Sequence, residues 1–150
     1  MALIKSISGI RGTIGGIPGN NLTPVDVVEC TTGLGILLKK YHRIPKIVVG
    51  RDGRISGSIV SQLAINTLLA MGIDVVDLGL STTPTVEMMV PKLNAGGGII
   101  FTASHNPKEW NALKFLNQDG EFISAEEGQE IIDIIKSRHL AYTDVDHLGT

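Results

Sequence analysis

Short apolar runs without polar alternation limit the folds that are open to this chain. Ile47–Val49 and Gly98–Phe101 contain no polar side chain, whereas a strand with one solvated face alternates apolar and polar residues. Strands of this kind are buried on both faces, which is typical of parallel strands covered by helices. We therefore expect a sheet that lies between two layers of helices.

Helical patterns separate these runs. Thr23 and Pro24 are typical of a helix start, with threonine as the N-cap and proline at the first helical position. A second helix is predicted after the glycine-rich stretch that ends at Gly57, a third from Thr85 to about Leu93, and a fourth after the capping box at Ser124. Since strands and helices alternate, the chain is expected to form a layered α/β domain.

The remaining apolar segments complete the predicted sheet. Leu3–Ile7 and Ile73–Leu80 are predicted as strands, and so is Ala112–Leu116, which should pair antiparallel with Gly98–Phe101 across a short loop. Four of these five segments alternate with helices, and the prediction is a three-layer α/β/α domain with a mixed, mostly parallel four-stranded sheet, over residues 1–136. Residues 137–150 lose periodicity and are predicted to be a linker toward later domains.

Composition excludes several classes of function. A formal net charge of −2 without a long basic run argues against nucleic-acid partners. The apolar stretches fall short of the roughly 20 residues that span a bilayer, and no signal peptide is expected, so no membrane partner is predicted. The single cysteine, Cys30, excludes an internal disulfide. Together these features predict a cytoplasmic protein.

The segment Thr102–Pro107 is the leading candidate for chemistry. It follows a predicted strand, which must stop at Asn106-Pro107 because proline disfavours helical and strand continuation around it. Ser104 is therefore expected on a loop at a strand end, where open α/β sheets bind ligands. Lys114 lies among apolar neighbours in the next predicted strand, so its ammonium needs an anion or a route to water. A phosphate held on Ser104 would supply that anion.

Two glycine-rich segments are further candidates. Arg11 is expected on a glycine-rich turn, where it could bind a phosphate through two parallel hydrogen bonds. The stretch Gly50–Gly57 connects a strand to a helix, which is a common arrangement for phosphate binding. This arrangement makes a nucleotide-binding domain the alternative. The glycines of this stretch, however, fit neither the dinucleotide-binding spacing nor the P-loop spacing, which makes the alternative the weaker one.

These segments also resemble a known family. Thr102–Pro107, followed by Asn111–Lys114, is similar to the phosphoserine loop of the α-D-phosphohexomutases, which include phosphoglucomutase, phosphomannomutase and phosphoglucosamine mutase. The segment around Arg11 and the Gly-Arg-Asp-x-Arg stretch at Gly50–Arg54 resemble two further signatures in the same order. The chain has Ser8 and Gly9 where many members have an aromatic lead-in, so only Arg11 is carried over there. The resemblance covers residues 1 to about 135.

The resemblance implies a phosphoenzyme. Ser104 would carry a phosphoryl group, pass it to a hexose monophosphate and take the other phosphate back, which moves phosphate between the 1- and 6-positions of glucose, mannose or glucosamine phosphate. It implies catalytic roles for Ser104, Lys114, Arg11 and His105, with Lys114 also a candidate acid or base. The implied phosphate-binding residues are Arg11, Thr102, Asn106 and Lys114. Asp52, Arg51 and Arg54 are expected mainly to support the site.

The resemblance also implies cofactors and partners. The family's Mg²⁺ is held by the phosphoserine, here Ser104, and by an Asp-Gly-Asp-Gly-Asp loop that does not occur in this sequence. The remaining ligands are therefore expected in later domains of the same polypeptide, and the 150-residue chain alone is expected to be inactive. Hexose 1,6-bisphosphate is the implied activator and intermediate, and a sugar phosphate the implied substrate. The alternative is a nucleotide- or sugar-phosphate-binding module without catalysis.

Overall fold

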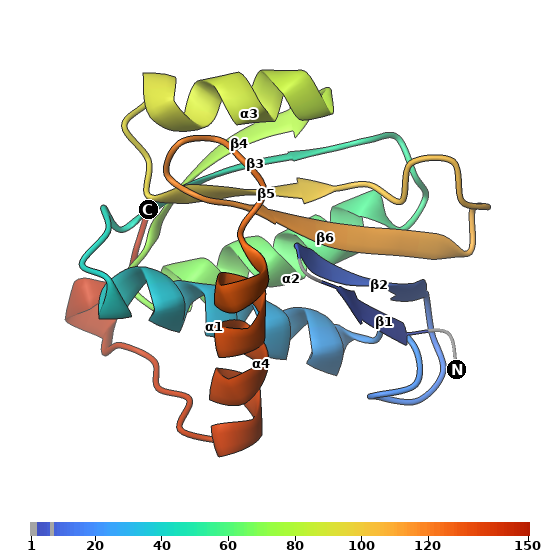
Figure 1. Ribbon diagram of the computed structural model, residues 1–150, viewed down its shortest axis with the longest axis horizontal. Coiled ribbons are helices and arrows are strands. Elements are labelled where there is room, and N and C mark those ends of the chain that lie inside the picture. Colours follow the sequence, from blue (N-terminus) through green and yellow to red (C-terminus); the bar gives the residue numbers. More distant parts are fainter. Residues whose placement is uncertain (1–2, 7) are drawn as a thin grey trace.

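A six-stranded sheet with strand order β1-β2-β6-β5-β3-β4 forms the centre of the molecule (Figure 1). The computed structural model describes residues 3–6 and 8–150. The strands are β1 (Leu3–Ser6), β2 (Gly9–Thr13), β3 (Lys46–Arg51), β4 (Asp74–Leu80), β5 (Gly97–Phe101) and β6 (Trp110–Leu116). The helices are α1 (Pro24–Lys40), α2 (Gly57–Ala70), α3 (Thr83–Lys92), α4 (Ala125–Ser137) and the short 3-10 helix η1 (Val145–His147).

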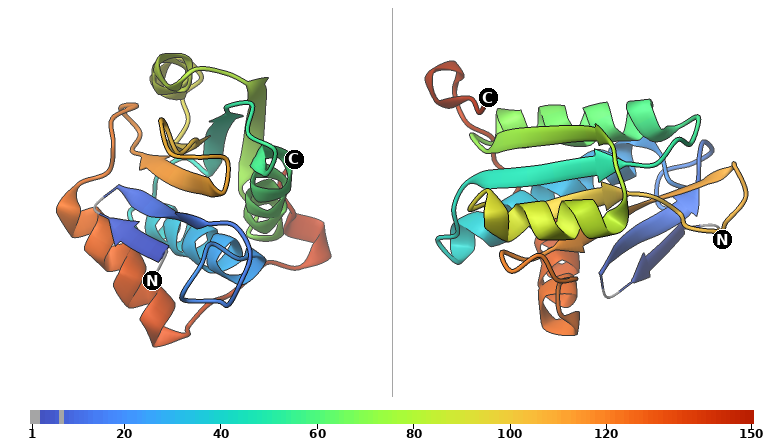
Figure 2. Two further views of the ribbon diagram at one scale, coloured as in Figure 1. Left: turned by 90° about the vertical axis from the view of Figure 1, so that its right-hand side faces the viewer. Right: turned by 90° about the horizontal axis from the view of Figure 1, so that it is seen from above.

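The helices cover both faces of this sheet, as predicted. α1, α2 and α4 lie on one side and α3 lies on the other, so the three-layer α/β/α arrangement is confirmed (Figure 2). The larger core cluster joins the sheet to α1, α2 and α4 and includes Leu34, Leu68, Phe101 and Ile131. A smaller cluster joins it to α3 through residues such as Val86 and Val90. No helix in the described part of the chain is long and apolar enough to cross a bilayer.

The sheet is mixed, as predicted, but it has more strands and fewer parallel pairs than expected. β3 pairs in parallel with β4 and β5, whereas the β1–β2, β2–β6 and β5–β6 pairs are antiparallel. The prediction of four strands, mostly parallel, is therefore wrong. The antiparallel pairing between β5 and β6 is confirmed. Ile7, the last residue of the predicted first strand, lies outside the described residues.

The main reason for the difference is β2. The glycines of the segment Gly9–Gly12 predict a turn, but the segment pairs with β6 along its whole length. A Cβ atom on Gly9 would lie 1.9 Å from the carbonyl oxygen of Leu113. Glycine is therefore needed at this position because the two backbones approach closely. The chain reverses directly before Gly9, since β1 and β2 pair antiparallel with Ser6 opposite Gly9, but the residues that follow continue as a strand.

Helix starts follow their predicted caps closely. α1 begins at Pro24, and its N-cap Thr23 donates through its backbone N–H to the Asp26 carboxylate. α4 begins after Ser124, whose hydroxyl accepts a hydrogen bond from the N–H of Glu127. α3 begins at Thr83, earlier than predicted, because Thr82 is its N-cap.

The segment after α4 returns to the sheet. The N–H of Thr143 donates to the carbonyl oxygen of Ala70, and the N–H of Val75 in β4 donates to that of Thr150. The residues predicted to form a linker thus lie against α2 and β4, at the end of the sheet opposite the Ser104 loop (Figure 1).

Candidate functional site

The loop between β5 and β6 carries Ser104 at the carboxyl end of β5. Ser104 is exposed, and its φ of 54° lies in the left-handed region that residues with a side chain seldom adopt. Such a conformation persists only where the surrounding contacts hold it. The contacts of this loop are therefore central to the site.

Arg54, in the loop that follows β3, holds the Ser104 loop by its backbone. Its two terminal nitrogens donate to three carbonyl oxygens of the loop, those of Ser104 at 3.0 Å, Asn106 at 2.8 Å and Pro107 at 2.8 Å, and to that of Trp110 at the start of β6 at 3.1 Å. Its Nε donates to the Asp52 carboxylate at 3.3 Å. All five N–H groups of the guanidinium therefore have acceptors within the protein.

Asp52 connects Arg54 to the start of the same loop. Its carboxylate accepts hydrogen bonds from the backbone N–H of Arg54 at 3.2 Å and from the hydroxyl of Thr102 at 2.6 Å. Thr102 Oγ1 in turn accepts a hydrogen bond from the backbone N–H of Ser104 at 3.1 Å. Arg51 lies beside this pair and donates to the carbonyl oxygen of Asp52.

Lys114 reaches the Ser104 side chain from the neighbouring strand. Its Nζ lies 2.9 Å from Ser104 Oγ. Lys114 is half-buried in β6, where it lies opposite Ile100 of β5. The sequence indicates that this lysine needs an anionic partner or a route to water, and the structure directs its ammonium to the serine hydroxyl.

Arg11 lies on the same face of the sheet as Lys114. In the antiparallel β2–β6 pair, Arg11 is opposite Ala112 and Gly9 is opposite Lys114, and paired residues point to the same face. Both cations line a pocket of about 220 Å³, which is floored by small residues such as Gly9 and Ala112. Arg11 is exposed, and its guanidinium lies 5.9 Å from the centre of the Trp110 ring.

His105 and Asn106 occupy the outer part of the Ser104 loop. His105 is exposed, and no hydrogen bond of its side chain is seen within the described residues. Asn106 contributes its backbone, since its N–H donates to the carbonyl oxygen of Ala103 and its own carbonyl oxygen accepts from Arg54. The two side chains are available to a ligand above the loop.

Two residues of β6 support the site although the sequence analysis assigned them no role. Asn111 is fully buried, and its amide donates to Ser56 Oγ at 2.9 Å, which ties β6 to the start of α2. Trp110 lies against Arg11. An amide side chain directly before the predicted strand Ala112–Leu116 was a usable signal for Asn111, because a polar group that becomes buried needs a partner.

The described residues do not form a metal centre by themselves. No group of three or more His, Cys, Asp or Glu side chains with suitable spacing occurs among residues 3–6 and 8–150. Asp52 is the carboxylate bonded into the Ser104 loop, and its oxygens already accept from Thr102 and Arg54. A metal at Ser104 would therefore need ligands beyond these residues.

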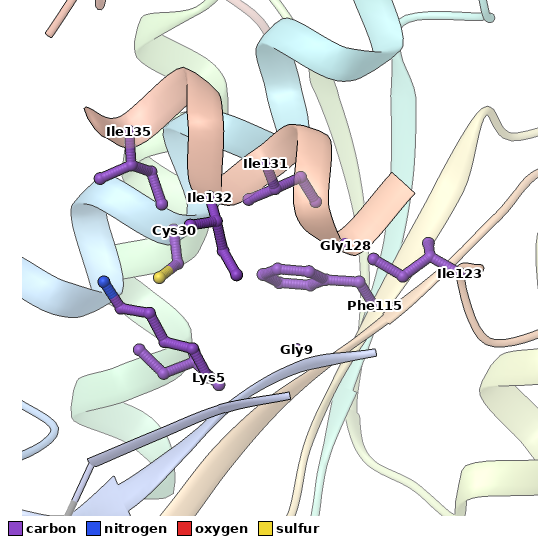
Figure 3. A pocket seen from close by; sticks show the side chains of 10 residues that line it. Lys5, Gly9, Cys30, Phe115, Ile123, Gly128, Ile131, Ile132 and Ile135 are labelled. Carbon is purple, nitrogen blue, oxygen red and sulfur yellow. The ribbon is translucent and has the colours of Figure 1, made fainter. Parts of the chain in front are cut away.

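A second pocket lies on the other face of the sheet and has a different character. It is lined by apolar side chains, among them Phe115 and Ile131, with Cys30 and Lys5 at one side (Figure 3). Burial raises the pKa of the Cys30 thiol to about 12. Its apolar lining offers little to a phosphate, in contrast to the Arg11–Lys114 pocket.

Comparisons with known proteins show which proteins this chain is similar to. Residues 3–141 match the family model described as phosphoglucomutase/phosphomannomutase, alpha/beta/alpha domain I. A phosphoglucomutase/phosphomannomutase of Thermococcus kodakarensis is 41% identical over 112 residues, which is 73% of this chain and 25% of that protein. A phosphoglucosamine mutase of Pediococcus pentosaceus is 40% identical over 126 residues, which is 82% of this chain and 27% of that protein.

Solved structures give the same result for the fold. A structure from Thermus thermophilus, provisionally described as a phosphomannomutase, superposes with a TM-score of 0.80 at 26% identity and covers 100% of this chain and 34% of that one. Parafusin, a phosphoglucomutase from Paramecium, superposes with a TM-score of 0.71 at 25% identity, over 92% of this chain and 26% of that one. The chain thus spans about a quarter to a third of the length of these relatives.

Proposed function

This chain belongs to the phosphoglucomutase/phosphomannomutase family as its α/β/α domain I, and from that premise we propose that it is the phosphoserine-bearing domain of a phosphohexomutase. In this proposal Ser104 carries a phosphoryl group and exchanges it with a hexose phosphate by way of a bisphosphorylated sugar. The relatives named above are mutases for glucose, mannose or glucosamine phosphate, and the substrate of this chain is proposed to come from that class.

The hydrogen bond between Lys114 Nζ and Ser104 Oγ, at 2.9 Å, is the observation that carries the proposal. An exposed serine hydroxyl in contact with an ammonium is well placed to hold a phosphoryl group, because the cation offsets the charge that develops on the oxygens. Arg11 adds a second cation on the same face of the sheet.

The direction of transfer sets the role of each group. When the phosphoryl group leaves Ser104, the bond between phosphorus and Oγ breaks, a bond to a sugar hydroxyl oxygen forms, and the proton of that hydroxyl passes to solvent. The Lys114 ammonium then donates to Oγ and stabilises its negative charge, and it can return a proton to that oxygen. In the reverse step Lys114, which gave its proton to Oγ in the forward step, takes the proton of the Ser104 hydroxyl as Oγ attacks phosphorus, and the sugar oxygen that leaves phosphorus takes a proton from solvent. Arg11 and His105 are proposed to donate hydrogen bonds to the phosphoryl and sugar oxygens.

Ser104, through its phosphate, would hold the Mg²⁺ that the family resemblance implies, and the ion would supply charge neutralisation there. The described residues offer no cluster of carboxylates to complete its coordination, so the other ligands are proposed to come from later domains. For the same reason the 150-residue chain by itself is expected to show negligible mutase activity. The protein is proposed to act in the cytoplasm on a soluble sugar phosphate.

The proposal is tested by locating phosphate on the protein purified from its source. Peptide mass spectrometry is expected to find a phosphoryl group on Ser104, and addition of a hexose monophosphate is expected to remove it. Ser104→Ala in the complete protein should abolish mutase activity. If Ser104 is never phosphorylated and Ser104→Ala leaves mutase activity intact, the domain is a sugar-phosphate-binding module without catalysis.

The reading frame beyond Thr150 gives an independent check. An Asp-Gly-Asp-Gly-Asp run about one domain downstream would supply carboxylates for the proposed magnesium site. A stop codon soon after Thr150 would leave Ser104 without them in the same polypeptide, and would contradict the proposal that later domains complete the site.

A further inference from the structure

We propose that Thr102 is a positioning residue that fixes the backbone of Ser104, and that it does so because Asp52 dictates the direction of its hydroxyl. This role differs from the phosphate binding that the family resemblance implied for Thr102. The relevance of the proposal to phosphoryl transfer rests on the proposed function, whereas the contacts themselves do not.

The argument begins with the single proton of the Thr102 hydroxyl. That proton is donated to Asp52 Oδ2 at 2.6 Å, a short distance that is typical of a hydrogen bond to a carboxylate. A hydroxyl has one donor, so Thr102 has none left for a phosphate while this bond exists. What remains is a lone pair on Oγ1, and this lone pair accepts the N–H of Ser104 at 3.1 Å.

Asp52 and Arg54 together hold both peptide groups of Ser104. The Ser104 N–H is held through Thr102, and its carbonyl oxygen accepts from Arg54 at 3.0 Å. Asp52 connects these two contacts, because its carboxylate accepts hydrogen bonds from the Thr102 hydroxyl and from Nε of Arg54. With its two flanking peptide groups fixed, Ser104 is kept at its φ of 54° and its Oγ points to Lys114.

The consequence concerns the phosphoryl site. Because the Ser104 N–H is bonded to Thr102, it is not a donor to a phosphoryl group on the same residue. The charge of that group must then be met by side chains such as those of Lys114 and Arg11. A fixed serine keeps its oxygen in line for attack, and small displacements of a nucleophile lower the rate of transfer steeply.

Amide hydrogen exchange of the ¹⁵N-labelled 150-residue chain tests the proposal without any turnover. Thr102→Val keeps the shape of the side chain and removes the acceptor, so the Ser104 amide is expected to exchange about tenfold faster, a factor that suits the loss of one ordinary hydrogen bond. Thr102→Ser keeps the hydroxyl and should restore slow exchange. Thr102→Ala repeats the test with less bulk. Thr67→Val is the matched control, because the Thr67 hydroxyl donates only to Leu63 within α2.

The outcomes separate clearly. Faster exchange confined to the Ser104 loop in Thr102→Val and Thr102→Ala, with rescue by Thr102→Ser, supports the positioning role. Unchanged exchange at Ser104 in Thr102→Val, or equal acceleration in Thr102→Ser, overturns it. Faster exchange at amides throughout the β-sheet would also overturn it, because that result would show a loss of global stability and no specific effect on Ser104. None of these results depends on whether Ser104 is phosphorylated, so failure here is distinct from failure of the proposed function.

Discussion

Lys114 Nζ lies 2.9 Å from Ser104 Oγ, although Lys114 belongs to the sheet and Ser104 lies on a loop outside it. Lys114 projects from the middle of β6, and Ser104 lies on the loop that precedes this strand. The contact forms because β5 and β6 pair antiparallel, which returns the chain alongside the strand that leads to the serine. A short β-hairpin thereby brings a hydroxyl and an ammonium together.

Loss of the Lys114 charge is expected to impair phosphoryl transfer strongly. In the complete protein, Lys114→Met should lower the rate of phosphoryl transfer about 100- to 1,000-fold, as is typical when a donor to a developing oxyanion is removed. Stopped-flow or quenched-flow measurement of Ser104 dephosphorylation by a sugar phosphate would give this rate. Lys92→Met, at an exposed position of α3, is the control and should transfer at the normal rate. A comparable loss in both variants would contradict the assigned role.

Arg54→Lys is expected to destabilise the protein although it retains the positive charge. Lysine has three donors and no planar fork, so it cannot replace the five N–H contacts of Arg54. The free energy of unfolding in urea should fall by roughly 2 kcal/mol, because carbonyl groups of the loop lose their partner. Arg51→Lys is the matched control, since one hydrogen bond from Arg51 to Asp52 is seen. Equal effects of the two substitutions would argue against a special role for Arg54.

Gly9→Ala is expected to disturb the pairing of β2 with β6. Its Cβ would lie 1.9 Å from the carbonyl oxygen of Leu113, so one of the two backbones must shift. The expected loss in unfolding free energy is about 3 kcal/mol, at the upper end of overpacking effects. Gly53→Ala serves as the control, since a Cβ there meets no atom within 4 Å. If Gly9→Ala and Gly53→Ala unfold at the same temperature, the close approach of β2 to β6 does not require a glycine at position 9.

Cys30 is expected to resist alkylation in the folded protein. Burial raises the pKa of its thiol to about 12, so at pH 8 the thiolate is about a thousandfold scarcer than in an unfolded chain. Reaction with iodoacetamide, followed by mass spectrometry, should therefore be slow in buffer and fast in concentrated urea. Fast labelling of the folded protein would show that α1 and α4 separate readily around this residue.

The sequence contained much of the local structure of this domain. The caps at Thr23 and Ser124 predicted the starts of α1 and α4, and the buried strands around Ile47 and Ile99 predicted a sheet covered on both faces. These features depend on residues that are close together in the chain. Propensity and periodicity can therefore identify them before any tertiary contact is known.

The position of Ser104 was also accessible from the sequence. The turn signal at Asn106-Pro107, after the predicted strand Gly98–Phe101, placed the serine on a loop, and an isolated charge in an apolar strand pointed to Lys114. The family resemblance added the expected chemistry. Neither line of reasoning contained the distance between the two side chains.

Only the tertiary structure decided how these parts meet. β2 could not be predicted because Gly9 is needed for a close approach to β6, a partner about a hundred residues away in sequence. The five contacts of Arg54 and the left-handed conformation of Ser104 likewise depend on the loops after β3 and β5 lying side by side. The sequence by itself determined which segments form helices and buried strands, because those choices rest on local pattern and burial. The order of the strands and the geometry of the site required the folded chain, because they arise from hydrogen bonds between residues that are distant in sequence.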